Sequence, residues 1–152
     1  MGSVSFRRAV PEDVAALVAL LADDPIARGR ESAAPPLDPC YAEAFAAIER
    51  DANQLLVVAD RDGRAVGLLQ LSFIPGLTRR GMWRGQIEGV RVAAGERQGG
   101  IGRATLEWAI EECRKRGCGM VQLTSDKQRS AAHGFYEALG FRATHEGYKL
   151  SF

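Results

Sequence analysis

The chain has 152 residues, of which 46% are hydrophobic and 26% charged, and its formal net charge at pH 7 is +1. This length predicts a single domain, residues 1–152, with enough chain to bury a core. The near-neutral charge offers no basic excess for nucleic acid. No apolar run approaches the roughly 18 residues of a membrane-spanning helix. Charged residues also interrupt the N-terminal segment too early for the apolar core of a signal peptide. We therefore expect neither nucleic acid nor a membrane as a partner.

The three cysteines, Cys40, Cys113 and Cys118, are odd in number and form no Cys-x-x-Cys pair. This usage predicts a reduced, cytoplasmic setting in which each cysteine is a small buried hydrophobe. No grouping of His, Cys, Asp and Glu has the spacing of metal ligands, so we expect no bound metal.

The first fifty residues predict a strand, a helix, a loop and a second helix. Residues 3–10 have strand character, and Pro11-Glu12-Asp13 opens a helix whose apolar stripe ends near Ala22. Residues 23–39 follow neither a helical nor a strand period and predict a long loop. Asp38 is expected to cap a helix that ends at Arg50.

The remaining chain alternates between strand and helix patterns, with turns at Asp62-Gly63, Gly117 and Gly140. The expected elements are strands over 54–60, 65–74, 82–94 and 120–124, helices over 101–116 and 130–139, and one or two final strands within 141–152.

A glycine-rich turn joins the predicted strand 82–94 to the helix that starts at Ile101. The first turn of a helix has unpaired N–H groups and partial positive charge, and glycines let an anion approach those donors. Arg97 and Arg103 add charge, so residues 97–103 predict a pyrophosphate cradle. A tight strand-to-helix connection is the alternative. No Lys-Ser or Lys-Thr follows the glycines, and no dinucleotide fingerprint is present.

Two motifs in this order resemble the GNAT superfamily of acyl-CoA N-acyltransferases. The first is Arg97-x-x-Gly100-x-Gly102, which matches the family loop Arg/Gln-x-x-Gly-x-Gly/Ala. The second is Ala132-x-x-Phe135-Tyr136-x-x-x-Gly140-Phe141, which matches the family's helix-and-strand signature. The resemblance implies a mixed α/β fold, with a central, mostly antiparallel sheet of six to seven strands and about four helices on both faces.

The same resemblance implies an N-acetyltransferase with acetyl-CoA (coenzyme A) as co-substrate and no metal. The acetyl group would pass directly, in a ternary complex, to a primary amine of a small molecule or peptide, because no Gly-x-Ser-x-Gly or Cys–His pair suggests a covalent intermediate. The alternative is a non-catalytic acyl-CoA-binding sensor or interaction module. The acceptor would be lined by loops 23–39 and 76–85 and the C-terminal strands. A homodimer is possible, since dimers are frequent in the family.

Two residues are the catalytic candidates. Tyr136 aligns with the family tyrosine near the thioester sulfur, where a neutral phenol can protonate the departing thiolate. Glu88 is the candidate base: strict alternation puts it on the side of Val90 and Val92, where partial burial would raise its pKa. Two alternatives stay open for Glu88, a bulge at Gly89 that shifts the alternation and a simple ion pair. An ordered water is the other possible base.

The backbone of the strand and of the glycine turn is expected to hold the cofactor. Many family members have Asn where this chain has Arg129, so that contact is not carried over; Arg129 reaches a phosphate, reaches the acceptor or is solvated. His133 is a packing residue or contacts the coenzyme A arm. The basic Arg79, Arg80 and Arg84 hint at an anionic acceptor or serve solubility. The full cofactor set is Val90, Arg91, Val92, Arg97, Gln98, Gly99, Gly100, Ile101, Gly102, Arg103, Arg129 and His133.

Overall fold

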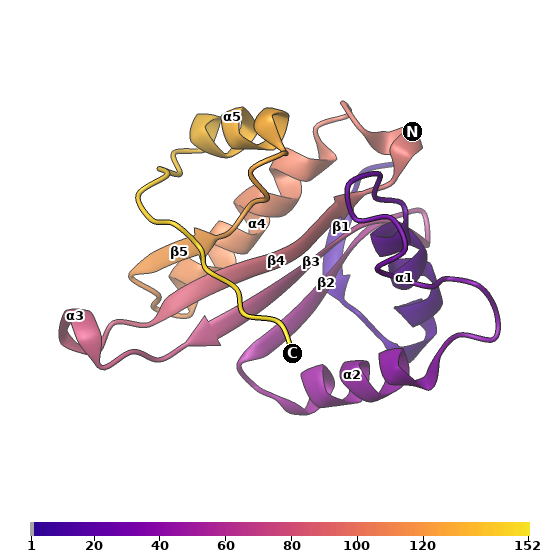
Figure 1. Cartoon of the computed structure of the whole chain (residues 1–152), viewed down its shortest axis with the longest axis horizontal. Helices are drawn as coiled ribbons and strands as arrows, with labels where there is room; N and C mark the ends of the chain where they lie inside the picture. The colour runs from indigo at the N-terminus through magenta and orange to yellow at the C-terminus, as the bar shows by residue number, and fades with distance from the viewer. Residues whose placement is uncertain (1) are drawn as a thin grey trace.

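The computed structural model describes residues 2–152 and contains a five-stranded sheet with the order β1-β2-β3-β4-β5 (Figure 1). Neighbouring strands are antiparallel except β4 and β5, which are parallel. The strands are β1 Ser5–Arg8, β2 Gln54–Arg61, β3 Arg64–Ile74, β4 Arg84–Val92 and β5 Met120–Leu123.

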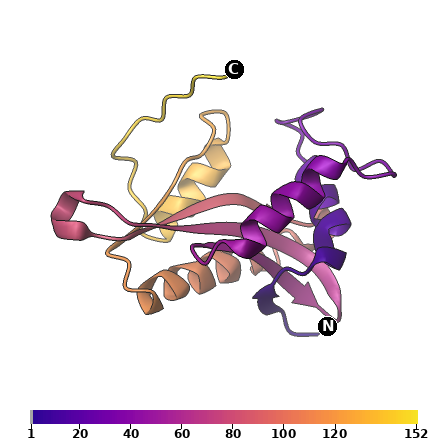
Figure 2. The same ribbon diagram turned by 90° about the horizontal axis from the view of Figure 1, so that it is seen from below.

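Helices cover both faces of this sheet: α1 and α2 lie against one face and α4 against the other (Figure 2). α4 is the crossover that parallel strands require, here from β4 to β5. Asp38 caps α2 as expected, its Oδ1 accepting from the Cys40 amide at 2.9 Å. The helices are α1 Val14–Ala22, α2 Pro39–Arg50, α3 Thr78–Gly81, α4 Ile101–Lys115 and α5 Ser130–Ala138, with single 3-10 turns at Pro11–Asp13 and Ala94–Glu96.

Successive residues of β3 supply two separate apolar clusters, because side chains alternate across a sheet. Leu69 packs with Leu106 of α4 in the first cluster. Leu68 points the other way and packs with Leu17 of α1 and Phe45 of α2. The sheet is therefore buried on both faces, and its near-continuous apolar strands follow from that burial.

α4 approaches β4 closely because residue 85 is glycine. A Cβ at Gly85 would stand 2.2 Å from the Cys113 sulfur, so no larger residue fits without movement of the helix. Burial, with Cys118 beside it, raises the pKa of the Cys113 thiol to about 12. The expectation that every cysteine is buried is wrong for Cys40, which is exposed near the start of α2.

The prediction of final strands within 141–152 is also wrong, so the sheet has five strands within residues 2–152 rather than six to seven. Tyr148, Leu150 and Phe152 alternate as in a strand, yet all three are exposed. Alternation describes which side chains share a face, whereas a strand also needs a neighbour to complete its hydrogen-bond ladder. No helix formed by residues 2–152 is long and apolar enough to cross a bilayer.

Candidate active site

The site opens where β4 and β5 part. The two strands pair only over 84–87 and 120–123, and β4 then continues to Val92 alongside β3 alone. α4 starts at Ile101 and α5 starts at Ser130. The first turns of these two helices lie on either side of this gap (Figure 1). The unaccompanied edge of β4 thus faces the start of two helices.

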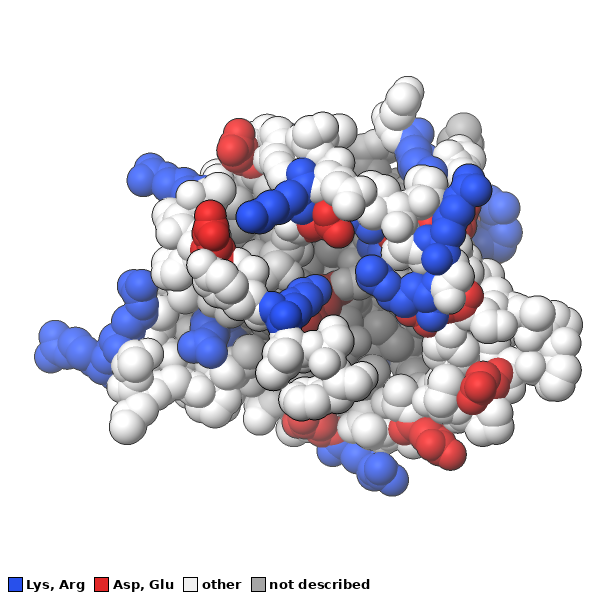
Figure 3. All heavy atoms as spheres, viewed as in Figure 1, with Lys and Arg blue, Asp and Glu red and all other residues white. Residues whose placement is uncertain are grey.

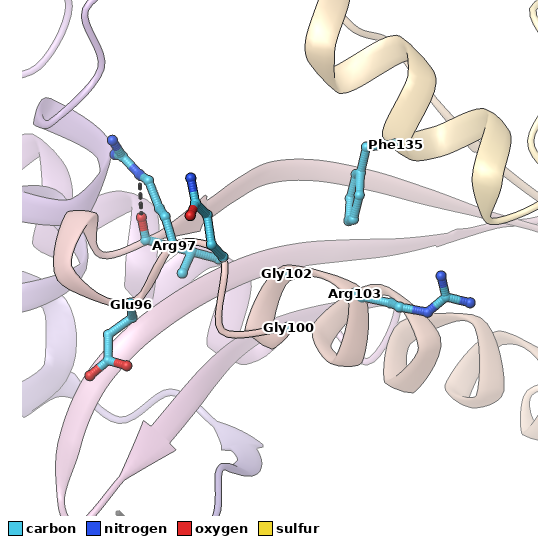
Figure 4. A pocket seen from close by; sticks show the side chains of 8 residues that line it. Glu96, Arg97, Gly100, Gly102, Arg103 and Phe135 are labelled. Atoms are coloured by element: carbon cyan, nitrogen blue, oxygen red, sulfur yellow. Dashed lines mark hydrogen bonds between the residues drawn. The ribbon is translucent and has the colours of Figure 1, made fainter.

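The glycine turn forms a cavity at this point, shown in Figure 4. Gln98 and Gly100 have positive φ values of 71° and 78°, which turn the chain into α4 so that its first amides lack intrahelical partners. Ile101 is 2% exposed and anchors the turn in the core, so only its backbone is available to a ligand. The cavity measures about 400 Å³ and is lined by Val92, Glu96, Arg97, Gln98, Gly100, Gly102, Arg103 and Phe135.

The charged side chains of the turn are held by protein partners. Arg97 Nε donates to the Val92 carbonyl at 3.2 Å (Figure 4), and Arg97 Nη2 donates to the Asp23 carboxylate at 3.2 Å. Arg103 pairs with Glu107 at 2.7 Å on the exposed side of α4. Glu96 is ion-paired with Arg61 and Arg64. The side-chain charges of the turn are therefore paired, and the partial positive charge at the start of α4 is what favours an anion there.

Tyr136 lies on α5, one residue after the cavity-lining Phe135. Its ring meets Phe141 edge-on, with the centroids 6.0 Å apart, and packs at the border of the cluster beneath α4. Burial raises the pKa of the phenol above 10, although the charges of Arg91 and Arg129 oppose that rise. The hydroxyl therefore keeps its proton at neutral pH and is able to donate it.

Glu88 does not lie where strict alternation predicts. Arg91 pairs with Leu68 and Glu88 with Gln70, so that two residues, Gly89 and Val90, oppose the single Leu69. This β-bulge, with Gly89 at φ 63°, is the alternative that the sequence left open. Glu88 accordingly shares a face with Arg91 and not with Val90, which packs toward the α4 side. It is exposed, so the predicted partial burial is wrong.

An ion cluster that the sequence did not predict joins three distant segments. Asp24 Oδ2 accepts from Arg91 Nη2 at 2.6 Å and from Arg129 Nη2 at 2.5 Å, while Asp24 Oδ1 accepts from the Ile26 amide at 3.0 Å. Burial alone would raise the pKa of Asp24, but the Arg129 and Ile26 hydrogen bonds and both arginine charges lower it to about 2. In the sequence Asp24 signalled only the end of α1, and no local pattern points to its partners.

Two further candidates have structural partners. Arg129 precedes α5 and is held by Asp24 rather than solvated. The His133 Nε2 lies 3.0 Å from the carbonyl oxygen of Asp126, which ties α5 to the loop that carries Arg129. Within residues 2–152 no group of three or more His, Cys, Asp or Glu residues could hold a metal ion.

Comparison with known proteins places this geometry in a family. The model of the acetyltransferase (GNAT) family matches residues 15–141. The chain is 32% identical to an aminoalkylphosphonate N-acetyltransferase of Salmonella typhimurium, over 69% of this chain and 68% of that protein. It is 37% identical to a glucosamine 6-phosphate N-acetyltransferase of Trypanosoma brucei brucei, over 76% of this chain and 78% of that protein.

Solved structures agree in fold. A structure titled transcriptional regulator, from Bacillus halodurans C-125, superposes with a TM-score of 0.96 and 47% identity, covering 99% of this chain and 100% of that one. A Trypanosoma brucei acetyltransferase superposes with a TM-score of 0.80 and 30% identity, covering 99% and 100%. With its glycine turn, its Phe135-Tyr136 helix and these relatives, the chain belongs to the acetyltransferase (GNAT) family.

Proposed function

We propose that this chain, as one catalytic domain, transfers an acetyl group from acetyl-CoA directly to the primary amine of a small molecule. The observation that carries the proposal is a convergence at the open edge of β4. Phe135 lines the same cavity as Gly100 and Gly102 of the turn, and Tyr136 follows it on α5. The glycine turn and the helix that carries Tyr136 thus flank one cleft, an arrangement that supports acyl-CoA transfer.

The residues present fit coenzyme A. The amides of Gln98 and of residues 100–103 suit its pyrophosphate, with Arg97 and Arg103 beside them, whereas the Gly99 amide donates to the Glu96 carbonyl at 3.4 Å. Gly102 leaves space in the cavity between Val92 and Phe135, because a Cβ at this position would contact their side chains at 3.6 and 3.7 Å. The backbone of Val90 to Val92 has no strand beside it on the β5 side, and this edge would take the pantetheine arm where the Val90 and Val92 carbonyls now accept from Arg91 and Arg97. When bound, the cofactor supplies the thioester that is broken.

Two side chains move protons in this scheme. Glu88, directly or through a water, accepts a proton from the acceptor ammonium, and the nitrogen then forms a bond to the thioester carbon. When the carbon–sulfur bond breaks, Tyr136 would give its proton to the departing thiolate, and the second proton lost by the attacking nitrogen would restore the phenol. No covalent acyl-enzyme is needed, so both substrates bind together.

The names of the two curated relatives support a small-molecule acceptor. An aminoalkylphosphonate and glucosamine 6-phosphate are both compact amines that carry a phosphorus oxyanion. Loop 23–39, which holds Asp24, and β4, which holds Glu88, are the segments we expect to contact such an acceptor.

A second candidate function is a non-catalytic acyl-CoA sensor or interaction module. The Bacillus halodurans structure, at 47% identity, is titled a transcriptional regulator, which supports this alternative. A sensor would need the glycine turn but would need neither Tyr136 as an acid nor Glu88 as a base.

The test is an acceptor screen. Purified protein is mixed with acetyl-CoA and a panel of amines, release of free thiol is followed, and products are identified by mass. We expect thiol release that depends on the amine, with a product heavier by one acetyl group. If acetyl-CoA raises the Tm but no amine in the panel accelerates thiol release, the enzyme proposal fails and the sensor takes its place.

A further inference from the structure

Asp24, Arg91 and Arg129 meet at one point although they come from the end of α1, from β4 and from the start of α5. Asp24 is 4% exposed, whereas the side chains of Arg91 and Arg129 remain 21% and 27% exposed. The carboxylate is therefore enclosed, while the two arginine side chains remain partly accessible from the surface. Figure 3 shows basic and acidic side chains together around the hollowed centre of this face.

The cluster has more cation than anion. One carboxylate oxygen is shared by two guanidinium groups, which leaves a net charge of +1 at the cluster. Arg91 Nη1 donates to the Val90 carbonyl at 2.7 Å, but its buried Nε has no hydrogen-bond partner within residues 2–152. The Arg129 guanidinium donates only to Asp24 among the same residues. Because a guanidinium carries five donors in a planar fork, both arginines keep donors free for an oxyanion.

The cluster stands beside the transfer site. Arg91 follows the bulge at Gly89 and shares the face of Glu88, at the edge where β4 has lost β5 as a neighbour. Arg129 precedes Tyr136 by seven residues, about two turns of helix. The charges of Arg91 and Arg129 lower the pKa of the Tyr136 phenol, against the larger opposite effect of burial.

We propose that Arg91 and Arg129, aligned by Asp24, bind an oxyanion carried by the amine acceptor. This inference rests on the proposed function, because Tyr136 marks the place of transfer only if the chain is an acetyltransferase. An acceptor amine that carries a phosphonate, phosphate or carboxylate supplies such an oxyanion. Two forks on one anion favour a tetrahedral group with three oxygens over a planar one with two.

The experiment compares matched acceptors. The kcat/KM for 2-aminoethylphosphonate is measured against those for propylamine, β-alanine and glucosamine 6-phosphate. We expect 2-aminoethylphosphonate to exceed propylamine by at least about ten-fold, with β-alanine between them. A preference for propylamine over both 2-aminoethylphosphonate and glucosamine 6-phosphate would overturn the inference. Equal values for 2-aminoethylphosphonate and propylamine would overturn the inference and leave the proposed function standing.

Variants then assign the preference to the cluster. Arg129→Gln and Arg91→Gln should each reduce the ratio of phosphonate to propylamine kcat/KM about ten-fold, mainly through the KM for phosphonate. Arg129→Lys, which keeps the charge but not the fork, should restore part of the ratio. Arg79→Gln, in the exposed basic turn of α3, is the matched control and should leave the ratio unchanged. A ratio that moves with Arg79 and not with Arg129 would refute the subsite.

A binding measurement keeps the inference testable without turnover. Calorimetric titration of 2-aminoethylphosphonate into the protein saturated with coenzyme A should show binding that Arg129→Gln weakens about ten-fold. Absence of binding to the unsubstituted protein would reject the subsite, whatever the thiol assay shows. Far-UV circular dichroism and Tm of each variant confirm that the fold is retained.

Discussion

Glu88 and Arg91 lie on the same face of β4 although three positions separate them in the chain. In a regular strand residues three apart face opposite sides; the β-bulge at Gly89 reverses this relationship. The strand therefore presents a carboxylate and a guanidinium together toward α1, and turns Val90 toward the core on the α4 side. The proposed base and the proposed acceptor-binding arginine can thus lie on one face of β4, on either side of the bulge.

Replacement of Glu88 tests the proposed base. We expect Glu88→Gln to lower kcat by about 10- to 100-fold below the pKa of the acceptor amine, since the ammonium then has no protein group to receive its proton. Rates measured across pH 6 to 9 should converge with those of the parent protein at high pH. Glu43→Gln, an exposed carboxylate on α2, serves as the control. A variant with full activity throughout this range would assign the base to water.

Removal of one oxygen tests the proposed acid. Tyr136→Phe keeps the ring that packs on Phe141 and should lower kcat by about 100-fold with little change in the Kd for coenzyme A. Because burial raises the phenol pKa above 10, activity of the parent protein should persist beyond pH 10 before it declines through loss of this proton. Steady-state rates against pH and calorimetric Kd values check both points. Unchanged turnover would remove Tyr136 from the reaction.

Substitution of two glycines at opposite ends of α4 distinguishes an effect on stability from an effect on coenzyme A binding. Gly100 and Gly117 have φ values of 78° and 77°, and neither has an atom within 4 Å of the position of a Cβ. Alanine at either site should cost roughly 1–2 kcal/mol of unfolding free energy, since a side chain disfavours the left-handed conformation. Only Gly100→Ala should also raise the Kd for coenzyme A, about ten-fold. Similar Kd values for the two variants would argue against the turn as the pyrophosphate site.

The Asp24 cluster predicts a dependence of stability on acid. The folded-state pKa of Asp24, about 2, lies below its ordinary value of 3.8, so its contribution is present above pH 4 and is lost as the pH falls toward 2. That contribution is roughly 2 kcal/mol. Between pH 5 and pH 2, urea unfolding of the parent protein should therefore show a larger fall in the free energy of unfolding than unfolding of Asp24→Asn. The difference should be roughly 2 kcal/mol. Parallel curves for the two proteins would contradict the low pKa.

Local sequence signals located most elements correctly. The end of α1 before Asp23, the cap at Asp38 and the Asp62-Gly63 turn each depend on backbone preferences of a few neighbouring residues. The same is true of the glycine turn before Ile101. The exposure of Cys40 and the lack of a strand within 141–152 depend on what packs nearby, which local preference does not encode.

The sequence by itself predicted the order of elements through α5, the glycine turn at residues 97–103 as a candidate anion site and the candidacy of Tyr136, because turn chemistry, periodicity and the two GNAT motifs depend on short runs of residues. Tertiary structure alone decided that the bulge turns Glu88 away from Val90 and that Asp24 joins Arg91 to Arg129. Asp24 and Arg129 are 105 positions apart, and their contact arises only when α1, β4 and α5 pack around one cleft. Charges so distant in the chain acquire a common role only through that packing.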